Sequence, residues 1–411
     1  MSKQSYEVVV FGATSFVGQI LARYLLDTFG VDGDLRWAIA GRSSAKLATL
    51  KQDLGGAADS LPVLLADADD EVALAAMCEQ AKVVISTVGP YALYGSPLVK
   101  ICAETGTDYC DLTGEVQWIR RMIQAHEATA KKNGARIVHC CGFDSIPSDM
   151  GVHFLQQHAQ ARFGAPCNSV RMRVKAMRGG MSGGTVASLM NVAAEVAQNP
   201  ALRKELANPY SICPEGCGSK VRQPNVKFAE YDAQARSWVA PFVMAAINTR
   251  VVQRSNALLG GAYGPDFRYD EAMMVGGGVA GRLKATAVAG GLGGFLVAAA
   301  LKPSRWVLER FVVPAPGEGP TPEQQRKGFF DLRFFGTTAD GHQLSVKVTG
   351  DRDPGYGSTA KMLGQAGVCL AKDISAKDCA GGFWTPATAF GDQLIDRLRA
   401  HSGLVFEVLN A

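Results

Sequence analysis

The chain opens with a strand that breaks at a glycine and continues into a helix. Val8–Phe11 are β-branched or aromatic, as in a buried strand, and Gly12 ends the run. From Phe16 the apolar residues recur at helical spacing, and the start of such a helix offers free backbone N–H groups to a phosphate. Gly18 lets the helix approach the strand closely. The pattern predicts the pyrophosphate turn of a dinucleotide-binding unit.

This turn reads G-x-x-S-x-x-G instead of the more usual G-x-G-x-x-G, with Ser15 where related NADP-type loops often carry glycine. An ordinary strand–helix turn with packing glycines is therefore the alternative. The residues of the turn that we expect to contact the cofactor are Gly12, Thr14, Ser15, Phe16, Val17 and Gly18.

The end of the second predicted strand favours NADP over NAD. Residues 35–40 are apolar except for Arg36 and lead into Gly41, Arg42 and Ser43, where an NAD-specific unit is expected to place an acid against the ribose hydroxyls. A guanidinium can bind a 2′-phosphate bidentately or stack on the adenine, and a serine hydroxyl can donate to the phosphate. We therefore predict NADP(H) as the cofactor; a solvated loop arginine is the alternative for Arg42.

Four further runs are expected to be strands that complete a six-stranded, doubly wound parallel sheet. These runs are residues 61–65, 83–88, 108–112 and 136–141. Asp67, near the end of the first run, either accepts from the adenine amino group or caps the next helix. Gly89, Pro90 and Tyr91 follow the second run, and α/β sheets bind ligands at the carboxyl edge of their strands. These three residues are predicted to form the wall beside the nicotinamide ribose.

The middle of the chain predicts a second, α+β domain that shapes the substrate pocket. Apolar and basic residues alternate over 170–176, as in a strand with one solvated face. A hairpin with an Asp-Gly turn is expected between residues 330 and 348, and helices over 185–198 and 242–259.

The predicted fold class is thus α/β: a Rossmann-type doubly wound parallel sheet with a second α+β substrate domain. The predicted domains are an NADP-binding Rossmann domain over 1–150, a substrate domain over 151–351, and a C-terminal segment over 352–411 whose helices and strand return to the first domain. In that last segment, helices are expected over 358–372 and 385–399, and a strand over 404–408.

Residues 285–301 are uncharged and carry four glycines. A helix of this length reaches about 25 Å, short of the roughly 20 residues that usually span a bilayer. Basic residues flank the segment on both sides, which suits an interfacial contact with anionic lipid. A helix buried in a domain or homodimer interface is the alternative.

Composition narrows the classes of function. Charged residues make up 19% of the chain and the net charge is +4, so a nucleic-acid partner is not expected. The 10 cysteines lack zinc-like spacing and suit a reduced, cytoplasmic protein, although the spacing of Cys213 and Cys217 leaves a metal or a disulfide open. No metal site is otherwise predicted. The N-terminus lacks a signal-peptide core, so we expect a cytoplasmic location with peripheral contact at the cytoplasmic membrane.

Five motifs resemble, in order and spacing, the saccharopine dehydrogenase-like oxidoreductases, and most closely the branch of the trans-acting enoyl reductases. The motifs are Gly12–Gly18, Ala40–Arg42, Val88–Tyr91, Tyr109–Glu115 and Gly142–Asp149, with further likeness at 316–320 and 359–362. The resemblance covers nearly the whole chain. It implies an NADP-dependent reductase of lipid or polyketide-derived acyl chains, with a role in glycolipid assembly and an association with membranes.

Reduction of an enoyl double bond requires a hydride for the β carbon, a donor to the carbonyl, and a proton for the α carbon. The candidates for the last two roles are Tyr91, Asp144, Ser145 and Lys175. Ser148 or Asp149 is expected to cap a helix over 150–160. A saccharopine-type amino-acid-conjugate dehydrogenase, or a non-catalytic NADP-binding sensor or lipid-surface scaffold, remains an alternative.

Overall fold

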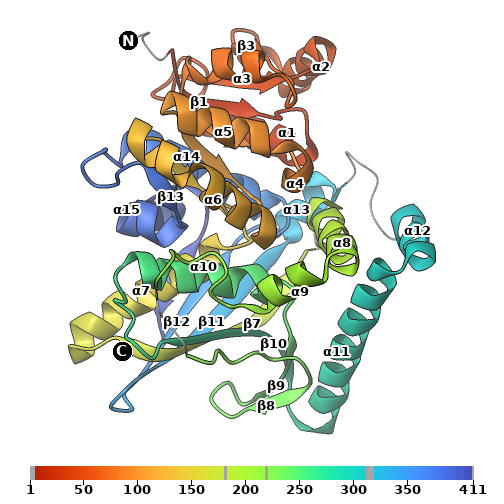
Figure 1. The fold of residues 1–411 in the computed structure, drawn as a ribbon, viewed down its shortest axis with the longest axis vertical. Coiled ribbons are helices and arrows are strands. Elements are labelled where there is room, and N and C mark those ends of the chain that lie inside the picture. Colours follow the sequence, from red (N-terminus) through yellow and green to blue (C-terminus); the bar gives the residue numbers. More distant parts are fainter. Residues whose placement is uncertain (1–4, 180–182, 218–220, 312–318, 410–411) are drawn as a thin grey trace. The chain divides into compact units, whose positions relative to one another are not determined.

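The chain divides into two compact units in the computed structural model, which describes residues 5–179, 183–217, 221–311 and 319–409 (Figure 1). The first unit comprises the described residues up to 143, with 319 and 355–403; the second comprises 144–311, 320–354 and 404–409. The boundary therefore falls before Asp144 and not after residue 150 as expected. Residues 316–318 of the resemblance and residues 180–182 lie outside the described residues.

A seven-stranded parallel sheet forms the centre of the first unit, in the order β13-β6-β5-β4-β1-β2-β3. Its strands are β1 (Tyr6–Phe11), β2 (Trp37–Gly41), β3 (Val63–Leu65), β4 (Ala81–Ser86), β5 (Asp108–Asp111), β6 (Arg136–Val138) and β13 (Gly382–Trp384). The doubly wound parallel sheet is confirmed, and its six predicted strands are present. The seventh, β13, was not predicted because it is three residues long and begins at the second glycine of a pair.

Two groups of helices accompany this sheet. They are α1 (Phe16–Phe29), α2 (Ser44–Leu54), α3 (Glu71–Cys78), α4 (Tyr91–Tyr94), α5 (Ser96–Thr105), α6 (Val116–Asn133), α14 (Gly357–Lys372) and α15 (Pro386–His401), with a 3-10 turn at Gly56–Ala58. Helix α1 contacts α14, which also contacts β1, β4 and β5, whereas α5 contacts both α3 and α6. Right-handed crossovers place these two groups on opposite faces of the sheet.

Strand β6 is shorter than the predicted run 136–141. Cys140 has φ +64°, a left-handed conformation that a strand cannot contain, and Cys141 donates its backbone N–H to the carbonyl oxygen of Asp111. The chain therefore leaves the sheet after Val138 and turns back over the end of β5.

A second seven-stranded sheet, mixed in direction, forms the centre of the second unit in the order β14-β12-β11-β7-β10-β9-β8. Its strands are β7 (Cys167–Arg178), β8 (Glu230–Asp232), β9 (Ser237–Pro241), β10 (Arg268–Gly276), β11 (Phe329–Thr338), β12 (Gln343–Gly350) and β14 (Val405–Val408). Strands β7 and β10 pair in parallel and the other neighbours are antiparallel. The predicted strand over 170–176 and the hairpin with the Asp-Gly turn are present, whereas β8, β9 and β10 were not predicted.

The last strand corrects the predicted C-terminal segment. Residues 404–408 were expected to return to the Rossmann domain, but β14 pairs with β12 in the second sheet. Only residues 355–403 belong to the first unit. The alternating pattern of a short strand does not say which sheet edge it completes, because any edge offers the same free backbone groups.

The second unit also contains helices. They are α7 (Ile146–Phe163), α8 (Gly183–Gln198), α9 (Pro200–Ala207), α10 (Ala245–Leu258), α11 (Gly278–Ala300), α12 (Lys302–Phe311) and α13 (Pro322–Lys327). Of these, α7, α10 and α11 contact the strands of the sheet. Helices α7 and α10 pack on one face, where Gly151 leaves room for the ring of Phe334. Side chains alternate along a strand, so Lys175 of β7 and Met274 of β10 point to the other face, against which α11 lies.

The start of α7 also differs from expectation. The helix begins at Ile146, with Pro147 in its first turn, so Ser148 and Asp149 lie inside the helix and neither caps it. Proline is favoured in the first turn because its fixed φ already suits a helix. A backbone N–H in that turn would have no partner within the helix, so its absence in proline costs no hydrogen bond. The predicted start at residue 150 is therefore four residues late.

Candidate active site

The predicted pyrophosphate turn lies between β1 and α1. Gly12 has φ +84°, and a β-carbon there would lie 2.6 Å from Cγ2 of Val88, so the turn requires glycine. A β-carbon on Gly18 would collide with the carbonyl oxygen of Gly12. The two glycines thus hold the first turn of α1 directly on the end of β1.

Ser15 joins this turn to β4. It is the N-cap of α1, where its Oγ accepts from the backbone N–H of Gly18 at 3.0 Å and donates to Oγ1 of Thr87 at 3.0 Å. Thr87 in turn donates to the carbonyl oxygen of Gly12 at 2.9 Å. The serine that departs from the usual glycine motif therefore organises the turn, and its hydroxyl has partners within the protein.

The turn has the features of a phosphate site. The backbone N–H groups of Phe16 and Val17, the first two of α1, have no hydrogen-bond partner among the residues that the structure describes. They point out of a helix start, where the helix dipole is positive. Thr14 is half-buried beside them, and the ring of Phe16 meets Tyr356 edge-on at 4.7 Å. These residues fit the pyrophosphate of a dinucleotide.

Arg42 and Ser43 follow β2 directly. Arg42 is exposed, and its guanidinium has no hydrogen bond or ion pair among the described residues. Ser43 is the N-cap of α2 and accepts from the backbone N–H of Lys46 at 3.3 Å. An exposed cation and a helix start without an acid fit a 2′-phosphate. Asp67 does not cap the next helix, because Asp70 holds that position.

The predicted nicotinamide wall begins with a cis peptide bond between Gly89 and Pro90. Tyr91, the first residue of α4, is 4% exposed, and its hydroxyl donates to the carbonyl oxygen of Ser86 at 3.0 Å. The backbone N–H of Leu112 donates to the same hydroxyl at 3.4 Å. The hydroxyl of Tyr91 therefore joins β4 to β5, an arrangement that disfavours it as a proton donor to a substrate.

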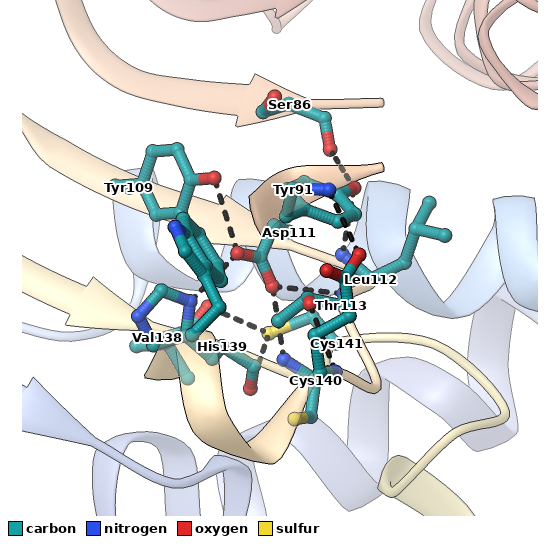
Figure 2. A network of polar contacts seen from close by, with 12 residues as sticks. Ser86, Tyr91, Tyr109, Asp111, Leu112, Thr113, Val138, His139, Cys140 and Cys141 are labelled. Carbon is teal, nitrogen blue, oxygen red and sulfur yellow. Dashed lines mark hydrogen bonds and ion pairs between the residues drawn. The ribbon is translucent and has the colours of Figure 1, made fainter. Parts of the chain in front are cut away.

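A buried polar network lies at the carboxyl ends of β4, β5 and β6 (Figure 2). Asp111, which is fully buried, contacts Nδ1 of His139 at 2.6 Å and accepts from the hydroxyl of Tyr109 at 3.1 Å. The other oxygen of Asp111 accepts from the backbone N–H groups of Thr113 and Cys140, both at 3.1 Å. Burial raises the pKa of Tyr109, so its hydroxyl stays protonated and donates. One carboxylate thus holds the loops after β5 and β6 together.

This network continues to the nicotinamide wall through Glu115. Oγ1 of Thr113 accepts from the backbone N–H of Glu115 at 3.2 Å. The fully buried Glu115 carboxylate accepts from the backbone N–H groups of Tyr91 at 2.8 Å and Ala92 at 3.0 Å, at the start of α4. An acid at a helix N-terminus also interacts favourably with the helix dipole. Glu115 therefore sets the position of the chain that follows Pro90.

Sequence reasoning missed Asp111, Glu115 and His139 as site residues, although two of them lie in the quoted motif Tyr109–Glu115. A signal was present, because Asp111 ends a predicted strand of the central sheet and acids are rarely buried without partners. The partners themselves lie up to 29 residues away, so the pattern could not identify them.

In the second unit, Ser145 and Asp144 stand before α7. Ser145 is fully buried, and its hydroxyl donates to Oδ1 of Asn248 at 3.1 Å. Nδ2 of Asn248 donates to Ser148 at 3.1 Å and to Glu271 at 2.9 Å. Ser145 thus belongs to a network that fastens α7 to α10 and β10, whereas Asp144 is half-buried.

Lys175 is not brought to Asp144 and Ser145. Its side chain is 53% exposed on the face of the sheet opposite α7, where it pairs with Asp331 at 3.8 Å. The four catalytic candidates therefore do not form one cluster, because Lys175 lies on the face of the second sheet opposite α7, the helix that follows Asp144 and Ser145.

The cysteines form no disulfide bond. All ten are free thiols, Cys213 and Cys217 included. Burial raises the pKa of Cys213 to about 12 and that of Cys167 to about 12, which keeps both thiols protonated. Within the described ranges, no group of three or more His, Cys, Asp or Glu side chains could hold a metal ion.

Comparison with known proteins agrees with this geometry. The sequence profile of the saccharopine dehydrogenase NADP binding domain matches residues 8–138. A Mycobacterium tuberculosis protein assigned to the trans-acting enoyl reductases is 39% identical over 406 residues, which cover 97% of this chain and 96% of that protein. The trans-acting enoyl reductase of Mycobacterium ulcerans is 35% identical over 407 residues, again 97% of this chain and 96% of the relative.

A solved structure shows the same fold. The saccharopine dehydrogenase (L-Glu forming) of Saccharomyces cerevisiae aligns with a TM-score of 0.53 at 14% identity, over 98% of this chain and 99% of that one. With the nucleotide turn, the arginine after β2 and the two-sheet architecture in place, the chain belongs to the saccharopine dehydrogenase-like oxidoreductases with an NADP-binding domain, in the family of the trans-acting enoyl reductases.

Proposed function

We propose that this chain uses NADPH to reduce the carbon–carbon double bond of an enoyl thioester with a lipid-like acyl chain. The observation that carries the proposal is the similarity of 35–39% to trans-acting enoyl reductases over 97% of the chain. The NADP-type nucleotide turn supports it, because enoyl reduction consumes a hydride that NADPH supplies when bound. A role in lipid or glycolipid assembly would follow from such a substrate.

The first unit supplies the cofactor contacts in this proposal. The free N–H groups of Phe16 and Val17 would hold the pyrophosphate, and Arg42 with the Ser43 hydroxyl would hold the 2′-phosphate. Asp67 would accept from the adenine amino group. Gly89 and Pro90, positioned through Glu115, would bound the nicotinamide ribose.

Asp144 is our proposed proton-handling residue among the four candidates. The hydroxyl groups of Tyr91 and Ser145 are buried and bonded to neighbours in their own units, and Lys175 lies on the opposite face of the second sheet. Asp144 follows β6 closely and is half-buried. Asp144→Asn is expected to lower kcat while the Kd of NADPH stays the same, and the exposed Asp266→Asn serves as the matched control.

We also propose that α11 contacts a lipid surface, from which an apolar substrate chain could be drawn. The helix has 23 residues and spans about 35 Å, longer than the predicted segment and enough to cross a bilayer by length and composition. Of its most apolar window, only 11% is buried. A helix of this kind in the core of a soluble protein would be mostly buried.

The test of the function is NADPH consumption by the full chain on two substrate panels. Stimulation by a long-chain 2-enoyl thioester, with a saturated product on mass spectrometry, is the expected result. Consumption that depends on lysine plus 2-oxoglutarate would instead identify an amino-acid-conjugate dehydrogenase. Tight NADPH binding without consumption on either panel would leave a sensor or scaffold and refute the reductase.

A further inference from the structure

A pocket opens between α11 and the strands of the second sheet on the face opposite α7. Its volume is about 650 Å³, and β7, β9, β10 and α11 contribute to its walls. The residues that line it are Lys175, Arg236, Ser237, Met274, Val275, Gly276, Lys284, Ala287 and Val288. Three of these side chains are cationic and none is acidic, so the pocket combines positive charge with an apolar wall.

Two of the three positive charges are uncompensated. Arg236 and Lys284 form no ion pair among the residues that the structure describes. Lys175 has only the long contact to Asp331, at 3.8 Å. Arg236 also has φ +51°, a conformation that costs free energy in a residue other than glycine. An arginine in a left-handed conformation among the cations that line a pocket indicates a site for an anionic group.

The apolar part of the site continues along α11. The residues of this helix that are buried are small, namely Gly281, Ala285 and Ala299, and they face the strands and α8. Large apolar side chains on the same helix are exposed, among them Val279 at 76%, Leu283 at 65% and Val297 at 62%. Exposed apolar surface of this extent marks a binding site for apolar partners.

Charge and aromatic character at this end of α11 favour a membrane surface over an acidic protein as the occupant. The guanidinium of Arg282 lies 5.6 Å from the centre of the Trp238 ring, and tryptophan and arginine together are typical of membrane interfaces. An acidic protein would match the cations, but it would leave the large apolar side chains in water.

We propose that the pocket formed by Lys175, Arg236 and Lys284 binds the phosphate headgroup of an anionic phospholipid, while the exposed apolar side chains of α11 enter the acyl region. The headgroup site rests on the proposed lipid contact of α11 and is independent of the reaction that the enzyme catalyses. It would orient the second unit on a membrane by a specific contact in addition to non-specific charge attraction.

The test is flotation of the full chain with vesicles of phosphatidylcholine alone and of an equimolar mixture with phosphatidylglycerol. Wild-type protein is expected to partition more strongly onto the mixed vesicles. The double variant Arg236→Gln, Lys284→Gln should bind them about 30-fold more weakly, from about 1 kcal/mol for each basic residue near an anionic surface.

A matched control distinguishes binding of a headgroup in the pocket from non-specific attraction between the positive charges and the vesicle. Arg222→Gln, Arg268→Gln removes two exposed cations of the same unit, with Arg268 at the opposite end of β10 from the pocket. The control should bind mixed vesicles like the wild type. Equal loss in the two double variants would refute the headgroup site, as would failure of the wild type to prefer phosphatidylglycerol.

Two further measurements distinguish the other outcomes. Light scattering shows whether a second copy of the chain binds to α11. The proposal would be overturned if the wild type formed a dimer that Leu283→Arg dissociates and did not bind vesicles. NADPH turnover of the wild type on the long-chain 2-enoyl thioester, without vesicles, is measured on the same preparation. Turnover without flotation refutes the lipid site alone, whereas flotation without turnover refutes the reductase alone.

Discussion

Glu271 is expected to make the stability of the second unit depend on pH. The side chain lies on β10 and is 2% exposed. Its carboxyl group accepts from the hydroxyl of Tyr269 at 2.8 Å and from Nδ2 of Asn248 at 2.9 Å. Burial raises the pKa of this carboxyl group to about 7, although hydrogen bonds from Ser148, Tyr269 and Asn248 oppose the change.

The direction of the effect follows from proton linkage. The folded-state pKa exceeds the value of 4.5 for an exposed glutamate, so the folded protein binds the proton more tightly than the unfolded chain does. The stability linked to this proton is fully present below pH 4.5 and is lost as the pH rises to about 7. At about 1.4 kcal/mol for each pH unit, the loss amounts to about 3 kcal/mol.

Glu271→Gln tests this linkage because the amide stays neutral at every pH. Urea unfolding, followed by tryptophan fluorescence, gives the free energy of unfolding from pH 4.5 to above neutrality. Wild-type protein should lose about 3 kcal/mol more than the variant across this range. Glu230→Gln, at an exposed position on β8, is the matched control and should follow the wild type.

Parallel pH curves for wild type and Glu271→Gln would refute the reasoning, whether or not the curves are offset. A uniform offset would mean that the amide changes the hydrogen bonds to Tyr269 and Asn248 by the same amount at every pH. The test therefore depends on how steeply the free energy of unfolding changes with pH and not on its value at any one pH.

Three further substitutions test the first unit. Arg42→Asp should weaken NADPH binding at least tenfold more than NADH binding, because a charge-assisted hydrogen bond contributes about 1.5–3 kcal/mol. Calorimetry measures both affinities, with Lys46→Ala as the control. Equal losses of affinity for the two nucleotides would contradict the 2′-phosphate role. Glu115→Ala leaves two backbone N–H groups at the start of α4 without their acceptor and should lower the free energy of unfolding by about 2–5 kcal/mol. Glu115→Gln keeps one acceptor oxygen and should lower the free energy of unfolding less. An unchanged urea midpoint in Glu115→Ala would exclude a stabilising role for this carboxylate. Gly18→Val forces α1 away from β1 and should abolish NADPH binding, and retained affinity would show that the turn does not hold the pyrophosphate.

The features predicted correctly are those encoded within a few residues of sequence. The change from strand to helical spacing around Gly12 and Gly18 reports a local backbone path, and the turn is where it was expected. Arg42 stands at the end of β2 for the same reason. The roles assigned to these residues in binding NADP stay predictions, although the family of the chain supports the cofactor itself.

The less successful predictions concerned polar side chains with distant partners. Tyr91 and Ser145 have hydroxyl groups suited to catalysis, but their partners are Ser86 and Asn248, and in the second case 103 residues separate the two. Ser148 and Asp149 carry capping chemistry, but Pro147 moves the helix start ahead of them. A buried hydroxyl takes whatever acceptor the fold brings to it, and a sequence pattern does not contain that information.

By itself, the sequence determined the strand–glycine–helix turn, the parallel sheet of the first unit and the family, because each depends on short-range periodicity or on motifs in a fixed order. Tertiary structure decided which sheet receives β14, that Glu115 holds the start of α4 after Pro90, and that α11 exposes its apolar side chains. An apolar helix has the same composition whether it is buried or exposed, and a buried carboxylate looks like any other acid. Only the long-range packing of segments that are distant in sequence separates these cases.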